Sequence, residues 1–310
     1  MKVTQRKSRK ELDKELRREL EASLRPELEK KIRKELDAPL RQELEQEIGK
    51  ELEATIRKEL EDKINLELQA RKKESLPLPL SKSPAEYELA EAKGRYIGYH
   101  TGPISEVQGV DAWVNSENED MIMDRHIGRT ISANIRRLGA RVYRDGDWDD
   151  TIAETLAQEV SRRPGIRTKD VLVTTAGALE DRKVHRIYHV ATVRRGYDKN
   201  GGFQAILEDL PACVSEVLNE VEKINARRFV RNRDRSILFP ILGAGDGNLQ
   251  IEEVTPKIIR AAVEFFERRP NSVLQKVYFL AYSERQRRAC NETFKALRDE
   301  KRLMDPVSEP

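Results

Sequence analysis

The beginning of the chain is constrained by an apolar repeat with a period of four residues. Every fourth position from Leu12 to Leu68 is Leu or Ile, and the intervening charges repeat every eight residues. An acidic residue follows one apolar position and an Arg usually follows the next, so opposite charges stand four residues apart. On a helix each such pair stabilises by roughly 0.2–0.5 kcal/mol. Because Glu, Lys and Arg have low strand preference, the repeat predicts an elongated helical segment.

The same period limits how this segment can pack. An α-helix has 3.6 residues per turn, so a step of four residues overshoots one turn by roughly 40°. The apolar stripe therefore winds right-handedly around the helix, and a long straight pairing cannot keep it buried. Two arrangements stay open: a solvated single helix held by its charge ladder, or shorter packed helices that break near Pro26 and Pro39.

Leucines in such number would expose much apolar surface if nothing covered them. We therefore expect residues 9–70 to form a homo-oligomerisation or partner-docking arm, with a solvated spacer as the alternative. Nucleic-acid binding is not expected, because 36% of all residues are charged but the formal net charge is only +3. Proteins that bind a nucleic-acid backbone usually cluster Lys and Arg.

A proline-rich segment, SLPLPLSKS, follows the repeat at residues 75–83 and is typical of an extended linker. The pattern after it changes to short β-rich runs that alternate with segments of helical apolar spacing. This alternation predicts a three-layer α/β/α domain with a mixed, mostly parallel sheet. The expected parts are a helical repeat at 1–74, a linker at 75–93, the α/β domain at 94–300 and a tail at 301–310.

Several classes of protein are not expected from the residues present. No run of about 18 apolar residues exists, and the basic start lacks the apolar core of a secretory signal. Cys213 and Cys290 fall within helical apolar patterns and have neither disulfide nor metal spacing. His185 and His189 lie on a strand-like run, so they do not form a helical metal-binding pair. We expect a cytoplasmic protein with no membrane segment and no metal.

Two loops after predicted strands carry candidate binding residues, since ligands of such sheets bind at the carboxyl ends of the strands. The first loop holds Asn115 and Asn118, whose amides can donate to and accept from ribose hydroxyls or a purine edge. Asn pairs also cap turns, and that alternative stays open. The second loop is glycine-rich, spans 243–247 and precedes a helix near Ile251. Its backbone amides suit a phosphate, with a plain tight turn as the alternative.

Four ordered blocks resemble the macro domain family between Gly94 and about Leu297. They are VDAWVN at 110–115 with Asn118, TAG at 175–177 followed by IYHV at 187–190, FPILGAG at 239–245, and the last strand at 277–283. The resemblance implies that the domain binds ADP-ribose or a related NAD-derived nucleotide between the two loops, with no cofactor. The binding residues it implies are Ile104, Asn115, Asn118, Ile127, Gly128, Gly243, Ala244, Gly245, Asp246, Gly247, Asn248, Leu249, Tyr282 and Ser283.

The chain departs from the family pattern at three positions. The Asp that reads the adenine amino group in most members is Pro103 here, the Asp that positions water in hydrolytic members falls on Gly128, and an aromatic residue of the phosphate loop falls on Gly247. The retained Asn and glycine-rich loops, the missing catalytic Asp and a repeat suited to self-association indicate a ligand sensor coupled to the helical arm. The resemblance alone suggests bacterial NAD-based defence signalling. The alternative is a hydrolase of ADP-ribose esters or phosphate derivatives, in which Asp124 or Asp246 acts as the catalytic acid or base.

Overall fold

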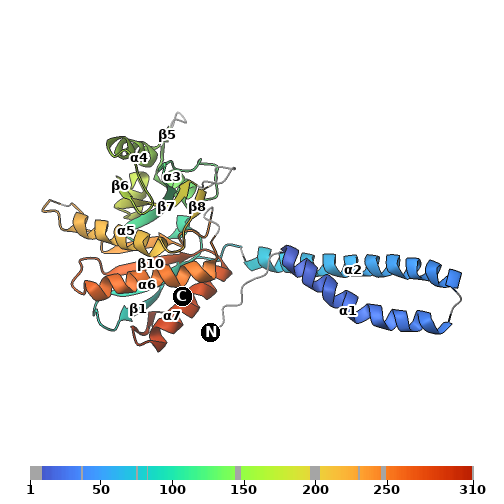
Figure 1. Ribbon diagram of the computed structural model, residues 1–310. Helices are drawn as coiled ribbons and strands as arrows, with labels where there is room; N and C mark the ends of the chain where they lie inside the picture. Colours follow the sequence, from blue (N-terminus) through green and yellow to red (C-terminus); the bar gives the residue numbers. More distant parts are fainter. Residues whose placement is uncertain are drawn as a thin grey trace. The chain divides into compact units, whose positions relative to one another are not determined.

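The structure, a computed structural model, describes eight stretches of the chain and divides it into two units, Met1–Glu74 and Ser75–Pro310 (Figure 1). The described stretches are residues 9–35, 38–74, 76–81, 83–143, 148–195, 203–229, 231–245 and 249–308. Asp246, Gly247 and Asn248 of the expected binding set therefore lie outside the described residues.

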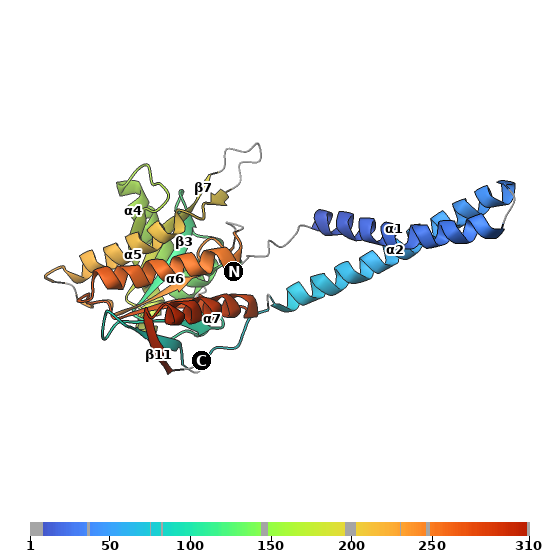
Figure 2. The same cartoon turned by 60° about the horizontal axis from the view of Figure 1, so that its bottom comes forward.

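The first unit consists of two helices, α1 (Arg9–Glu35) and α2 (Ala38–Glu74), which contact each other. They run side by side as a helical hairpin (Figure 2). Of the two arrangements left open, the structure has packed helices, but without a break at Pro26, which lies inside α1. Proline removes one backbone donor, and the ion pair between Arg25 and Glu29 at 3.5 Å spans this position. The helical ladder therefore continues across the proline.

The hairpin covers the apolar stripe only in part. Ile32, Ile56 and Leu60 are buried, whereas Leu40 is 56% exposed. The other repeat positions between residues 12 and 64 whose burial is described are half-buried. Each helix thus packs against the other for a short length before the right-handed drift turns its stripe away.

The second unit is built on a mixed sheet of nine strands within the described residues. The order is β11-β1-β2-β10-β9-β3-β7-β6, and β8 pairs with β7. The five strands β2, β10, β9, β3 and β7 run parallel to one another, as the sequence predicted. The strands are β1 (Ala85–Leu89), β2 (Tyr96–Thr101), β3 (Ala112–Asn118), β6 (Val171–Thr175), β7 (Arg186–Arg195), β8 (Phe203–Ala205), β9 (Ser236–Pro240), β10 (Lys276–Ala281) and β11 (Leu303–Ser308). A separate short hairpin pairs β4 (Arg141–Val142) with β5 (Trp148–Asp149).

Helices cover both faces of the sheet and form two apolar cores. One core takes side chains from α5 (Leu210–Asn225), α6 (Ile251–Arg268) and α7 (Glu284–Asp299). The other takes them from α3 (Ile131–Gly139), α4 (Thr151–Arg162) and the 3₁₀ turns η1 (Ile104–Glu106) and η2 (Gly177–Arg182). The three-layer α/β/α architecture predicted from the sequence is confirmed.

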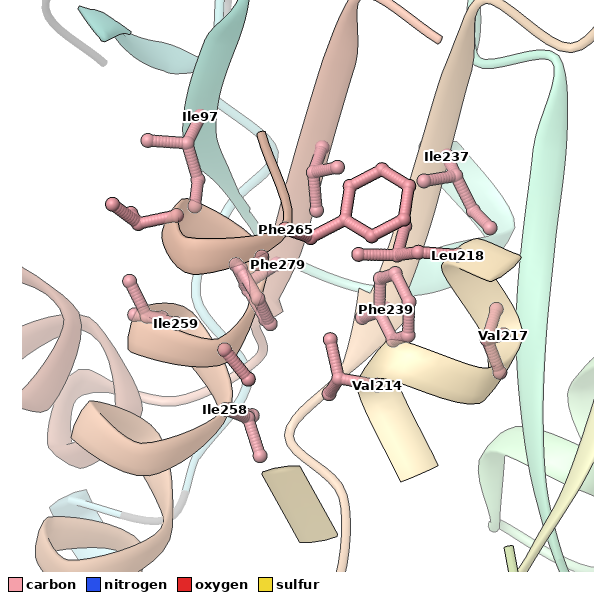
Figure 3. Packing of buried hydrophobic residues seen from close by; sticks show 14 of the residues in the cluster. Ile97, Val214, Val217, Leu218, Ile237, Phe239, Ile258, Ile259, Phe265 and Phe279 are labelled. Atoms are coloured by element: carbon pink, nitrogen blue, oxygen red, sulfur yellow. The ribbon is translucent and has the colours of Figure 1, made fainter. Parts of the chain in front are cut away.

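The larger core lies between the sheet and α5 and α6 (Figure 3). Phe239 of β9 and Phe279 of β10 are fully buried, and their ring centroids lie 5.7 Å apart. Phe265 and Ile258 of α6 pack in the same cluster. Burial of each such side chain stabilises by about 1.5–3 kcal/mol. This packing fixes the carboxyl ends of the central strands, where the site lies.

Two expected boundaries differ from the structure. The expected linker at 75–93 contains β1, and the expected tail at 301–310 contains β11, which pairs with β1 in antiparallel fashion. β11 is the edge strand, and β1 lies next to it, between β11 and β2. An edge strand carries charged residues and proline more readily than a central strand does, as in β11 (LMDPVS). The three middle residues of β1 (AEYEL) are only partly buried, so neither strand shows the apolar run on which the sequence prediction relied.

Candidate functional site

A pocket of about 650 Å³ opens at the carboxyl ends of the parallel strands. Every one of the five parallel strands contributes to it, either from its last residues or from the loop that follows it. Ligand pockets of small molecules typically have volumes of about 300–1,000 Å³. The contributing positions are Pro103 and Ile104 after β2, Asn118 of β3, Thr192 and Val193 of β7, Pro240 and Ile241 at β9, and Leu280 and Tyr282 at β10.

The glycine-rich loop forms one wall of the pocket, with Gly243, Ala244 and Gly245 all lining it. Gly243 has φ of +73°, and a Cβ there would meet the side chains of Leu210 at 3.0 Å and Leu249 at 3.1 Å. The Leu249 backbone N–H donates to the Gly243 carbonyl at 3.1 Å, which closes the loop before α6 begins. Leu249 itself packs against the larger core and does not line the pocket.

The two asparagines of β3 differ in position. Asn118 lines the pocket, and its Oδ1 accepts a hydrogen bond from the Asp120 N–H at 2.9 Å. Asn115 is fully buried and does not line the pocket. Its Nδ2 lies 2.7 Å from Glu117 Oε1 and 3.1 Å from His189 Nδ1. Asn115 therefore contacts the pocket residue Glu117 and is not itself part of the lining; its ligand contact, implied by the resemblance, stays a prediction.

His189 continues this buried network. Its Nε2 lies 3.0 Å from Thr174 Oγ1 on β6. Burial lowers the pKa of His189 to about 3, so the ring is neutral near pH 7. A neutral imidazole accepts at one nitrogen and donates at the other. With the proton on Nε2, Nδ1 of His189 accepts from the Asn115 amide and Nε2 donates to Thr174 Oγ1. The network thus holds Asn115 in a fixed orientation beneath the pocket.

Glu117 is a pocket residue that sequence reasoning missed. It lines the pocket, is 5% exposed, and its Oε1 accepts from Ser132 Oγ at 2.5 Å and from Asn115 Nδ2. Burial raises the pKa of the Glu117 carboxyl to about 7, although the hydrogen bonds from Ser132 and Asn115 lower it. The available signal was a carboxylate in an otherwise buried strand, two residues after Asn115 and so on the same face.

The segment between β3 and α3 places Asp124 and Gly128 at the pocket. The Asp124 carboxylate accepts from the Arg125 N–H at 2.7 Å and from Thr130 Oγ1 at 2.7 Å. A Cβ on Gly128 would collide with Asp124 Oδ2. Ile127, expected to contact ligand, is 89% exposed and does not line the pocket.

Two basic residues face the same space. Arg129, two residues before α3, and Arg137, in the last turn of α3, both line the pocket. The Arg137 guanidinium donates to the His126 carbonyl at 2.6 Å and to Asn134 Oδ1 at 2.5 Å. Arg129 is exposed. Positive side chains next to a helix N-terminus favour an anionic ligand.

The β2 and β10 side of the pocket is more apolar. Ile104 is buried and Tyr282 is 40% exposed, and both line the pocket as expected. The Tyr282 N–H donates to Gln286 Oε1 at 2.7 Å, which ties the end of β10 to α7. Ser283 does not line the pocket, since its hydroxyl caps α7 by accepting from the Gln286 N–H. Pro103 stands at the wall, with no carboxylate in its place.

Within the described stretches, no group of three or more His, Cys, Asp and Glu side chains is arranged to hold a metal ion. Among the helices of those same stretches, none is both long and apolar enough to cross a membrane. What the pocket offers chemically is hydrogen bonding, positive charge and apolar contact at one site.

Residues 114–258 match the family model described as Macro domain. Three similar solved structures are of the Oceanobacillus iheyensis macrodomain. A variant with ADPR is 16% identical with a TM-score of 0.52 and covers 70% of this chain and 100% of that one. Those with ADP and with MES bound are 17% and 16% identical, with TM-scores of 0.52, and each covers 70% of this chain and 98% of its own. No curated protein shows a significant match. At this level of identity the likeness establishes the fold.

Proposed function

We propose that this chain, whose C-terminal unit contains a macro domain, binds ADP-ribose or a related NAD-derived nucleotide in the pocket described above. The observation that carries the proposal is the convergence of all five parallel strands on one pocket of about 650 Å³, walled by a glycine loop. The Oceanobacillus iheyensis macrodomain, which shares the fold, has been solved with ADPR and with ADP.

The charges of the pocket suit a diphosphate. Arg129 and Arg137 line it on one side, and Gly243 to Gly245 line it on the other. Glycine allows backbone N–H groups to approach phosphate oxygens closely. We assign the diphosphate to the space between these two walls, where cations and backbone donors can both reach it.

The base belongs at the β2 and β10 side in this proposal. Ile104 and Tyr282 supply apolar and aromatic surface there, and Gln286 supplies an amide. Because Pro103 stands where most family members carry an Asp, no carboxylate reads the exocyclic amino group of adenine at this position. We therefore expect the pocket to discriminate weakly between adenine and other purines.

We further propose that the domain acts as a ligand sensor and that α1 and α2 transmit its occupancy by changing self-association. The half-buried leucines of the hairpin support this part, because a second copy could cover them. A ligand shifts an assembly equilibrium only if it binds the two assembly states with different affinity. The solution mass of the full chain, with and without saturating ADP-ribose, tests this part. The resemblance suggests bacterial NAD-based defence signalling as the setting.

Hydrolysis of ADP-ribose esters or phosphate derivatives is the second candidate function. The observation that favours it is the presence of two carboxyl groups, Asp124 and Glu117, at the pocket. Against it, both oxygens of Asp124 already accept hydrogen bonds, which weakens the residue as a base. Product formation by the wild-type chain and its loss in Asp124→Ala would favour the enzyme over the binding module.

A pocket-filling substitution tests the binding proposal. Ala244 lines the pocket, so Ala244→Trp should abolish calorimetric binding of ADP-ribose. Ala226→Trp is the matched control, because Ala226 is an exposed C-cap of α5 outside the pocket. Equal binding by both variants would contradict the proposal.

A further inference from the structure

Glu117 is a carboxyl group on the floor of the pocket whose role is not explained by the diphosphate and base contacts. It lies on β3 with its side chain toward α3, on the same face as Trp113 and Asn115. A carboxylate with 5% exposure in a central strand is uncommon, because burial of charge is costly unless the group is paired and hydrogen-bonded. The local structure holds this side chain in a fixed position.

The two oxygens of the carboxyl differ in their surroundings. Oε1 accepts from Ser132 Oγ and from Asn115 Nδ2. Oε2 receives no hydrogen bond from the described residues and is not sealed from the pocket. One oxygen therefore fixes the carboxyl, and the other can accept a hydrogen bond from a ligand.

No cation among the described residues forms an ion pair with this group. Arg136, whose charge lowers the pKa of Glu117, is paired with Asp150 at 2.6 Å, and the charge of Asp124 raises that pKa. His189, reached through Asn115, is neutral. The balance of burial against these contacts raises the pKa of Glu117 to about 7. The carboxyl is thus partly ionised near neutral pH, and a donor from the ligand would favour its ionised form.

We propose that Glu117 is a specificity-determining residue that accepts a hydrogen bond from a sugar hydroxyl at the end of the ligand farthest from the base. This inference rests on the proposed function. β9 lies between β10 and β3, and neighbouring strands are about 4.8 Å apart. Glu117 on β3 is therefore roughly 10 Å from Tyr282 at the end of β10. That distance leaves room for the diphosphate along the glycine loop, with the second sugar over β3.

The chemistry predicts which ligands bind. A hydroxyl donor satisfies the free oxygen of Glu117, whereas a phosphate at the same place would meet a like charge. ADP-ribose should therefore bind better than ADP-ribose that carries a terminal phosphate on its second sugar. The affinity for ADP, which lacks that sugar, should not depend on Glu117.

Calorimetric titration of the full chain tests the inference, with wild type, Glu117→Gln and Glu106→Gln compared at pH 8. Glu106 is an exposed carboxylate of η1 near the pocket but not in its lining, so it controls for the loss of one charge. We expect Glu117→Gln to weaken ADP-ribose binding by about five- to tenfold and to leave ADP binding within about twofold, with Glu106→Gln unchanged. Unchanged binding of ADP-ribose to Glu117→Gln, or equal weakening of both ligands, would overturn the role of Glu117.

The failure of this inference differs from failure of the proposed function. A wild-type chain that binds neither nucleotide refutes both proposals, whereas a chain that binds both with no effect of Glu117→Gln refutes only the role of Glu117. The unsubstituted chain gives an independent measurement. Its affinity for ADP-ribose should rise from pH 6 to pH 8 by up to about tenfold as the carboxyl ionises. An affinity that falls or stays constant over this range contradicts a carboxylate acceptor.

Discussion

The carboxylate of Asp124 occupies the space into which a side chain at residue 128 would project. A Cβ built on Gly128 collides with Asp124 Oδ2 and lies 2.9 Å from the Arg125 carbonyl oxygen. The same carboxylate accepts from Thr130 Oγ1, and Thr130 caps α3 through the Ala133 N–H. Glycine at 128 and aspartate at 124 are therefore two parts of one local structure, which forms the α3 side of the pocket.

Substitution Gly128→Ala should destabilise the chain by about 1–3 kcal/mol, because the new methyl group displaces the Asp124 carboxylate from its hydrogen bonds. Chemical denaturation followed by circular dichroism measures the change. Gly245→Ala is the control, since nothing lies within 4 Å of a Cβ there. If the two substitutions cost the same free energy of unfolding, the steric relationship between Asp124 and Gly128 is incorrect.

The raised pKa of Glu117 predicts a pH dependence of stability. An acid whose folded pKa lies above its unfolded value stabilises the fold below the unfolded pKa. That contribution is lost as the pH rises from 4.5 through about 7. The free energy of unfolding of wild type relative to Glu117→Gln should therefore fall between pH 5 and pH 8, by about 1–3 kcal/mol. His100 and His189, whose pKa values burial lowers, are present in both proteins and cancel in the comparison. A constant difference over this range would contradict the raised pKa.

Arg129 should contribute to affinity for the diphosphate. It is exposed and lines the pocket, so Arg129→Ala should weaken ADP-ribose binding by about three- to tenfold, with a smaller effect in high salt. Arg125→Ala provides the comparison, because Arg125 is an exposed residue of the same segment outside the pocket lining. The measurement is calorimetric titration at two salt concentrations. Equal effects of the two substitutions would show that only net charge matters.

The half-buried leucines of the hairpin should support self-association. Leu52→Glu places a charge on the apolar stripe and is expected to lower the solution mass of the full chain. Glu53→Gln, at the exposed neighbouring position, should leave the mass unchanged. Light scattering coupled to size exclusion measures both. A monomeric wild-type chain would contradict an oligomerisation arm.

The sequence predicted the central layer of the fold well because its physical signal is local. β9 and β10 are short apolar runs before a glycine loop or a helix, and such runs are typical of strands buried on both faces. β11 is the edge strand and pairs only with β1, whereas β1 lies between β11 and β2. Both were missed because neither is a continuous apolar run, and an edge strand tolerates charge. The β1–β11 pair joins segments more than 200 residues apart in the chain, which no local pattern reports.

The structure brings part of the predicted site together. Gly243, Asn118 and Tyr282, which stay predicted ligand contacts, line the pocket. Asn115 does not, because its amide is used by Glu117 and His189, and strand alternation alone does not show which side chains a neighbouring strand will engage. Glu117 was not predicted as a site residue because its position depends on a tertiary contact. Its carboxyl is buried against Ser132 of α3, and strand alternation does not report that contact.

Calorimetric titration of the unsubstituted chain with ADP-ribose tests whether the pocket binds this nucleotide. We expect saturable binding with one nucleotide per chain and a dissociation constant in the micromolar range or below, about −8 kcal/mol or stronger. Absence of heat and of competition across ADP-ribose, ADP and NAD at millimolar concentration would contradict it, and would show that the pocket at the ends of the parallel strands does not bind this class of ligand.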